Sequence, residues 1–293
     1  MIDTVELMRK VGNIRILTSR LVDDQLSGDY HSSFKGHGIE FDEVREYTVG
    51  DDIRSIDWNV TARVGFPHIK RFSEERELTV MFLVDVSGSQ SYSSTSQTKS
   101  ELAAELTCLL ALTSIRNQDN VGLILFSDHI VKTIPPRKGR KAVMRLVREV
   151  LAADNPDGGT DITGALNYLN NVLRRKAVVF LVSDFQDEGW EKRLSISALH
   201  HDLVCCHLSD PCENALPDVG LIELEDPETG ETMWVDTSSK RLRETFAAKA
   251  AERTESLASL FKRNKIDAMF LTTDADPIGN VRKFFRKRAA KTR

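Results

Sequence analysis

Three short stretches of the sequence carry oxygen-bearing side chains: residues 85–89 (DVSGS), 158–161 (GGTD) and 183–184 (SD). Carboxylates and hydroxyls are hard ligands, which suit Mg²⁺, Mn²⁺ or Ca²⁺ better than zinc. Because such a set holds few negative charges, a bound cation would keep net positive charge and an exchangeable position for an outside carboxylate. The candidate metal ligands are Asp85, Ser87, Ser89, Thr160 and Asp184.

The same residues also have a plainer interpretation as turn and capping residues. Asp, Ser and Thr after a strand often accept hydrogen bonds from nearby backbone N–H groups. Residues 85–89 alone do not separate the two interpretations, and the addition of Thr160 and Asp184 favours a metal site. We expect Asp161 to cap a helix and Ser183 to support a strand end, without contacting the ion.

The polar stretches follow segments that have the pattern of buried strands. Residues 78–86 and 177–185 are almost continuously apolar, which is typical of strands covered on both faces. Helix-like segments alternate with the strands, and this alternation predicts an α/β fold: a mostly parallel, Rossmann-like sheet with helices on both faces. Ligands bind at the carboxyl ends of the strands of such a sheet, where we expect Asp85 and Asp184. The expected strands are 78–86, 120–128, 129–136, 177–185, 202–210 and 266–274, and the expected helices include 99–116, 141–152 and 162–174.

The first part of the chain differs in texture from the rest. Residues 1–64 combine an expected helix, up to about Leu26, with a polar segment that contains glycine. We therefore predict an N-terminal module packed on the main domain, residues 1–76, and an α/β domain, residues 77–293. A β-hairpin insertion is expected near residues 220–238, around a Pro-Glu-Thr-Gly turn.

Composition and missing motifs exclude several classes of protein. The 293 residues carry a formal net charge of −4, so the chain as a whole has no bias toward nucleic acid. The four cysteines form no CxxC pair, which indicates reduced thiols in a reducing compartment. The N-terminus lacks the pattern of a signal peptide, and no apolar run approaches the ~18 residues of a transmembrane segment, so we expect a cytoplasmic protein. Since neither a phosphate-binding GxxxxGK[ST] loop nor a GxSxG nucleophile motif is present, we do not expect an enzyme.

The DxSxS pattern, a threonine after a glycine pair, and an aspartate that ends a later strand together resemble the metal-ion-dependent adhesion site of von Willebrand factor type A domains. The resemblance covers residues from about 77 to 275. It implies that the hydroxyls of Ser87, Ser89 and Thr160 touch a metal ion, that Asp85 and Asp184 act directly or through water, and that a Glu or Asp of a partner protein fills the sixth position. In one departure, Phe185 follows Asp184, where many such domains have glycine.

A second resemblance extends over nearly the whole chain. The runs at residues 36–63 (GHGIEFDEVREYTVGDDIRSIDWNVTAR) and 208–231 (LSDPCENALPDVGLIELEDPETGE) are similar to a bacterial family named as domain of unknown function fifty-eight. Its members carry a von Willebrand factor type A fold and resemble partners of MoxR-type AAA+ ATPases. Within residues 36–63, the alternating charges, such as those of Arg45 and Asp51, are expected to form an internal salt-bridge network, and Trp58 is expected to anchor the packing.

Three functions are compatible with these patterns. The one we favour is a metal-dependent protein-interaction module, which uses Mg²⁺ to capture an acidic side chain of a MoxR-type ATPase or of its client. The first alternative is a metal-dependent hydrolase or phosphotransferase that uses the same carboxylates. The second alternative is a structural scaffold with a vacant site. The absence of a recognisable general base in these motifs counts against the enzyme.

Overall fold

The fold is described from a computed structural model, in which the chain separates into two compact units. One unit contains residues 34–78, and the other contains the remaining described residues. The residues that the structure describes are 24–34, 40–73, 77–91, 93–153, 159–225 and 232–291. The glycine at position 158, the turn of the expected hairpin, and most of the expected N-terminal helix lie outside these residues.

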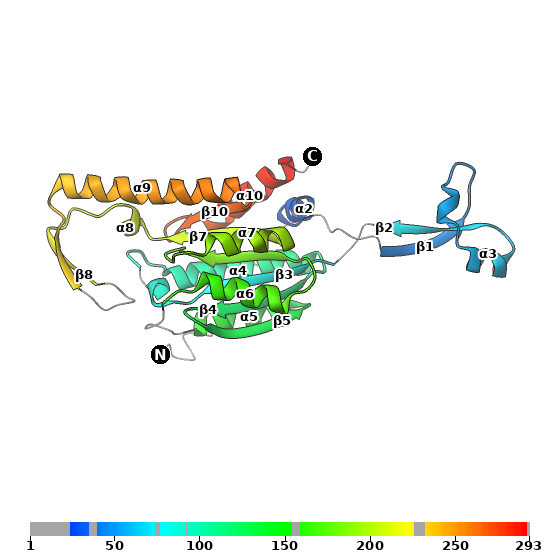
Figure 1. Ribbon diagram of the computed structural model, residues 1–293, viewed down its shortest axis with the longest axis horizontal. Coiled ribbons are helices and arrows are strands. Elements are labelled where there is room, and N and C mark those ends of the chain that lie inside the picture. The colour runs from blue at the N-terminus through cyan, green and yellow to red at the C-terminus, as the bar shows by residue number, and fades with distance from the viewer. Residues whose placement is uncertain are drawn as a thin grey trace. The chain divides into compact units, whose positions relative to one another are not determined.

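The larger unit is built on a six-stranded sheet with the strand order β10-β7-β6-β3-β4-β5 (Figure 1). All neighbouring strands are parallel except β4 and β5, which form an antiparallel pair at one edge. The mostly parallel α/β sheet predicted from the sequence is therefore confirmed. The strands are β3 (Thr79–Asp85), β4 (Asn120–Phe126), β5 (Ile130–Arg137), β6 (Val178–Ser183), β7 (Asp202–Ser209) and β10 (Asp267–Thr272).

Helices cover both faces of this sheet, as the continuous apolar strands require. On one face, α6, α7 and α9 share an apolar cluster with alternate strand residues such as Met81 and Leu83. The intervening residues Val80, Phe82 and Val84 are equally buried, and they face the layer in which α4 packs against α5. The helices of this unit are α2 (Asp24–Ser33), α4 (Lys99–Arg116), α5 (Arg140–Ala152), α6 (Ile162–Val172), α7 (Glu191–His200), α8 (Pro211–Asn214), α9 (Lys240–Arg263) and α10 (Pro277–Lys291).

The helix α4 begins beside the first polar loop and is apolar nearly all round. Thr98 and Glu101 form a capping box at its start, in which Thr98 Oγ1 accepts a hydrogen bond from the Glu101 N–H at 3.1 Å. Most of its residues are buried, which is typical of a helix at the centre of a domain. The capping box and the burial together fix the first turn of α4, which carries Lys99.

The helix α2 belongs to the sheet unit, although it precedes the other unit in the sequence. The Tyr30 hydroxyl donates a hydrogen bond to Asp119 Oδ2 at 2.8 Å, and Ser33 Oγ donates to the carbonyl oxygen of Phe285 in α10 at 2.8 Å. The rings of Tyr30 and Phe285 also pack edge to face. The expected boundary after residue 76 therefore differs from the grouping in the structure, which places α2 with the sheet.

The smaller unit pairs β1 (Glu40–Glu46) with β2 (His68–Ser73) in an antiparallel ladder. Between them lie a 3₁₀ turn and α3 (Trp58–Val64), and Asp57 caps α3 by accepting a hydrogen bond from the Asn59 N–H at 2.9 Å. Arg45 forms a two-pronged ion pair with Asp51 inside the unit, at 2.7 and 2.9 Å, as the expected internal network requires. The expectation for Trp58 is wrong, because 67% of this side chain is exposed.

The predicted hairpin is present beside the sheet unit. It pairs β8 (Leu221–Glu225) with β9 (Thr232–Asp236) in an antiparallel register. The short helix α8 lies between β7 and this hairpin in the chain, and α9 follows the hairpin (Figure 1). The segment between β7 and β10 thus contributes α8 to the carboxyl end of β7, next to the predicted site.

Candidate metal site at the carboxyl edge of the sheet

The first and third polar stretches meet because β3 and β6 are neighbouring parallel strands. Val84 pairs with Val182, so Asp85 and Ser183 follow as the next residues on adjacent strands. Ser183 Oγ donates a hydrogen bond to Asp85 Oδ2 at 2.6 Å. Both side chains are buried, and the Ser183 hydroxyl thus holds the Asp85 carboxylate at the end of the strand pair.

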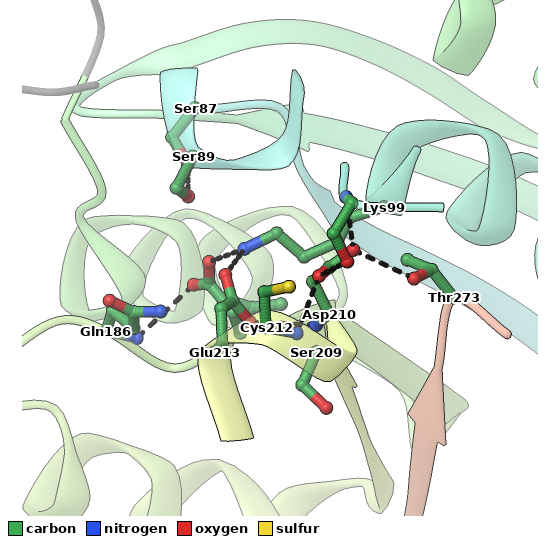
Figure 2. Close-up of polar contacts among 12 residues, drawn as sticks. Ser87, Ser89, Lys99, Gln186, Ser209, Asp210, Cys212, Glu213 and Thr273 are labelled. Carbon is green, nitrogen blue, oxygen red and sulfur yellow. Dashed lines mark hydrogen bonds and ion pairs between the residues drawn. The ribbon is translucent and has the colours of Figure 1, made fainter. Parts of the chain in front are cut away.

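The loop after β3 turns back on itself and brings its two hydroxyls together. The Ser87 N–H donates to Asp85 Oδ1 at 3.0 Å, and residues 88–91 form a single 3₁₀ turn. Ser87 Oγ and Ser89 Oγ lie 3.1 Å apart and share a hydrogen bond (Figure 2). Both serines are buried, so the loop presents two hydroxyls from the interior rather than from the surface.

The second polar stretch is attached to the same edge of the sheet through β4. The Asp161 N–H donates to the carbonyl oxygen of Ser127, just after β4, at 2.8 Å. Asp161 Oδ1 accepts from the Gly164 N–H at 2.7 Å, which confirms that Asp161 caps α6. The loop therefore joins the carboxyl end of β4, the strand that lies beside β3.

The hydroxyl of Thr160 has no hydrogen-bond partner among the residues that the structure describes, although its oxygen is buried. A buried hydroxyl without a partner loses the free energy of its contacts with water. In this loop, the unpaired oxygen is one of the predicted metal ligands, whereas the neighbouring Asp161 caps the helix through its Oδ1.

Burial and a neighbouring negative charge make the ionised form of Asp85 unfavourable. The pKa of Asp85 is raised from 3.8 to about 7, first by burial and then by the charge of Asp184, although hydrogen bonds from Ser183 and Ser87 oppose the rise. Such a carboxylate is stabilised by any positive charge that approaches it. Two buried carboxylates at one edge of the sheet therefore favour a cation between or beside them.

The structure supplies one cation that the sequence analysis did not identify, the ammonium of Lys99. Its Nζ lies 2.8 Å from Asp184 Oδ2 and 2.7 Å from Glu213 Oε1, and none of the side chain is exposed (Figure 2). Burial alone lowers the pKa of Lys99, but the carboxylates of Asp184 and Glu213 outweigh it and raise the pKa above its ordinary value. Lys99 is therefore charged at neutral pH.

One feature of the sequence points to this role for Lys99. A positive charge in the first turn of a helix is unfavourable, because the helix dipole places partial positive charge there. A lysine at this position, opening a helix that is otherwise buried, requires carboxylate partners from other elements. Those partners are 85 and 114 residues away in the sequence, which is why spacing alone does not reveal them.

Glu213 is held in place by a capping box at the start of α8. The Asp210 N–H donates to Glu213 Oε2 at 2.9 Å, and Asp210 Oδ1 accepts from the Cys212 N–H at 2.9 Å. Asp210 also accepts from the Ser94 N–H at 2.9 Å and from Thr273 Oγ1 at 3.0 Å (Figure 2). These bonds tie α8 to the loop before α4 and to the end of β10, so the Glu213 carboxylate has a fixed place beside Lys99.

The turn after Asp184 accommodates phenylalanine, the residue at which the sequence departs from the resembled pattern. Phe185 has a φ of 56°, a left-handed conformation that costs roughly 1–2 kcal/mol for a residue other than glycine. Its N–H donates to Ser183 Oγ at 3.0 Å, and its ring packs against Trp190 and Phe261. The buried aromatic contacts offset the backbone cost, and the turn leaves Asp184 at the strand end.

The donor set suits a hard cation with a low total ligand charge. It comprises two carboxylates and three hydroxyls, and the buried hydroxyl oxygen of Thr160 has no hydrogen-bond partner in the part of the chain that the structure describes. Among the described residues, no group of three or more His, Cys, Asp or Glu side chains is arranged to hold a metal ion. The structure joins Asp85 to Ser87 and joins Ser87 to Ser89 by hydrogen bonds. It pairs Asp184 with Lys99, and among the described residues it shows no hydrogen bond from Thr160 to the other four candidate ligands.

The chain matches one family profile and is similar to several mycobacterial proteins. Residues 43–256 match the profile of a family described as "Protein of unknown function DUF58". An uncharacterised protein of Mycobacterium tuberculosis is 27% identical over 290 residues, which cover 98% of this chain and 91% of that protein. A shorter uncharacterised protein of Mycobacterium avium is 29% identical over 158 residues, which cover 53% of this chain and 93% of that protein.

Two solved structures were found to be similar at low sequence identity. The conserved hypothetical protein BatB from Bacteroides thetaiotaomicron is 16% identical, with a TM-score of 0.46, over 73% of this chain and 99% of that chain. The SpRpn10 VWA domain is 9% identical, with a TM-score of 0.39, over 70% of this chain and 94% of that chain. Within the described ranges, none of the helices has both the length and the apolar character that a bilayer crossing needs.

Proposed function

Because the chain belongs to the DUF58 family of proteins of unknown function, with a von Willebrand factor type A-like fold, we propose that it is a metal-dependent protein-interaction module. The observation that carries the proposal is the buried hydroxyl of Thr160, which has no partner within the described ranges and lies at the edge where Asp85 and the serine pair also lie. When bound there, a hard divalent cation such as Mg²⁺ supplies a positive charge that an acidic side chain of a partner can reach.

The residues of the chain have separate roles in this proposal. Ser87, Ser89 and Thr160 offer neutral oxygens, which bind a cation without cancelling its charge. Asp85 supplies a buried carboxylate, and the Ser183 hydroxyl orients that carboxylate through its 2.6 Å hydrogen bond. Asp184 supplies a second carboxylate, whose Oδ1 accepts a hydrogen bond from the Gln186 N–H at 3.3 Å. The cation would therefore remain attractive to an external carboxylate.

The partner that we propose is a MoxR-type AAA+ ATPase or its client, in the cytoplasm. This part of the proposal is supported by the family resemblance of residues 36–63 and 208–231. The alternative of a metal-dependent hydrolase or phosphotransferase stays a hypothesis. Metal-dependent turnover of a phosphate ester, lost in Asp85→Ala, would support that alternative instead.

A pull-down with a purified MoxR-type ATPase from the same genome tests the proposal. We expect the full-length chain to capture the ATPase in millimolar Mg²⁺ and to lose it in EDTA or in the variant Asp85→Ala. Asp128→Ala is the matched control, because Asp128 also follows a sheet strand but is exposed and pairs with His129. Equal capture in EDTA and in Mg²⁺ would show that a bound cation does not mediate the contact.

A further inference from the structure

The ammonium of Lys99 pairs with Asp184, one of the two carboxylates that the proposed function assigns to a metal ion. We propose that Lys99 competes with the divalent cation for Asp184, and that Glu213 is the second acceptor to which the ammonium turns when the cation binds. This inference rests on the proposed function. It identifies Lys99 and Glu213 as the residues that set the affinity of the site for its cation.

The first support is the geometry of the ion pair. Lys99 Nζ is 2.8 Å from Asp184 Oδ2, and the side chains of Lys99 and Asp184 are 0% and 1% exposed. A cation that binds Asp184 through this oxygen competes with the ammonium for it. Two positive charges at one carboxylate also repel each other strongly where little water screens them. The ion pair therefore weakens the binding of a second cation.

The second support is that Lys99 cannot leave the site when it releases Asp184. Since its side chain is fully buried, an ammonium without a partner would be costly. Glu213 Oε1 already lies 2.7 Å from Nζ, so it can hold the ammonium alone. The other oxygen of Glu213 is fixed by the Asp210 N–H, which keeps the carboxylate at this distance from Lys99.

Titration with Mn²⁺, followed by the electron paramagnetic resonance signal of free Mn²⁺, tests the inference. Lys99→Met removes the charge and keeps an unbranched side chain only one atom shorter, and we expect it to bind Mn²⁺ at least about ten-fold more tightly than the wild type. We expect Glu213→Gln to bind at least about three-fold more weakly, because the displaced ammonium loses its second acceptor. In the Lys99→Met background, Glu213→Gln should no longer weaken binding.

The matched control is Lys132→Met, because Lys132 also pairs with a glutamate, Glu149, but on the surface. We expect this variant to bind Mn²⁺ like the wild type. If the wild type binds Mn²⁺ and Lys99→Met binds with equal or lower affinity, the inference is wrong while the proposed function stands. If none of the variants binds Mn²⁺, both are wrong.

Circular dichroism in EDTA establishes which variants fold. Should Lys99→Met fail to fold, Glu213→Gln decides the question, since Glu213 is partly exposed and its glutamine substitute keeps an acceptor for the Asp210 N–H. A weaker Mn²⁺ affinity of folded Glu213→Gln supports the competition, and an unchanged or tighter affinity refutes it.

Discussion

In the absence of metal, Asp85→Asn should stabilise the protein, although Asp85 lies at the centre of the proposed site. The pKa of this carboxyl is about 7 in the folded protein and 3.8 in its ordinary surroundings, chiefly because of burial and secondly because of Asp184. Each pKa unit of difference between the folded and unfolded protein corresponds to about 1.36 kcal/mol. Ionised Asp85 therefore lowers the free energy of unfolding at pH 8 by as much as about 4 kcal/mol.

The direction of the pH effect on stability depends on whether the folded or the unfolded protein holds the proton of Asp85. Between pH 3.8 and about 7, the folded protein keeps a proton on Asp85 that the unfolded chain releases. The stability that comes from this carboxyl is therefore greatest at low pH and is lost as the pH rises through about 7. Asparagine removes the titration, so its advantage over the wild type should be largest at pH 8 and clearly smaller at pH 5, where the wild type has lost only part of this stability.

The hydrogen bonds of Asp85 reduce the expected gain. The oxygen of an asparagine can still accept from the Ser87 N–H, while its amide group would face Ser183 Oγ, which must then accept. Altering one such bond costs about 1 kcal/mol. We therefore expect Asp85→Asn to exceed the wild type by about 1–3 kcal/mol at pH 8.

Urea unfolding in EDTA, at pH 8 and pH 5, measures this difference. Asp128→Asn is the control, because Asp128 is exposed and bonded to His129 and Ser127, so its pKa is lowered and its replacement should not stabilise the protein. If Asp85→Asn is less stable than the wild type at pH 8, with the same slope of unfolding free energy against urea concentration, then burial of the ionised Asp85 does not destabilise the protein.

Three further predictions concern the frame around the site. Burial lowers the pKa of His207 to about 4; the charge of Asp184 opposes this shift, and those of Lys99 and Arg253 add to it. The protein therefore loses stability as the pH falls from 6.5 toward 4. In His207→Gln, the drop in unfolding free energy between pH 8 and pH 5 should be about 2 kcal/mol smaller than in the wild type, as measured by urea unfolding. An equal drop in the variant and the wild type would contradict this prediction. Gly122→Ala should lower stability by about 1–3 kcal/mol in thermal unfolding, because the added Cβ would lie 2.9 Å from the carbonyl oxygen of Ile134 in β5. No loss of stability would show that β5 can move away from the added methyl group. Tyr30→Phe should cost about 1.5–3 kcal/mol in urea unfolding, because it removes a hydrogen bond to a buried carboxylate, and no loss would mean that α2 is not docked through this bond.

The sheet and the strand-end aspartates could be predicted because the relevant signals are local. The apolar run before Asp85 and that before Asp184 each specify a buried strand, and parallel strands bring their carboxyl ends to one edge. The helix cap at Asp161 follows from its type and from the apolar residues after it. These features depend on a few consecutive residues, so a single sequence contains them.

The pairing of Lys99 with Asp184 and Glu213 could not be predicted in the same way. It depends on how α4, β6 and α8 approach one another, and residues that touch across such distances in sequence leave no periodic pattern. The position of α2 could not be predicted for the same reason, because Tyr30 and Asp119 are 89 residues apart in the sequence. Trp58 was misjudged because a large aromatic side chain usually marks a core, whereas here it lies on the surface of a small unit.

The central claim is that a hard cation binds among the oxygens of the two loops that contain Ser87, Ser89 and Thr160. Crystals grown with Mn²⁺, with diffraction data collected above the manganese absorption edge, test it most directly. The account predicts an anomalous peak in contact with Thr160 Oγ1 and with the serine hydroxyls. Well-ordered loops with no anomalous peak among these oxygens would contradict it.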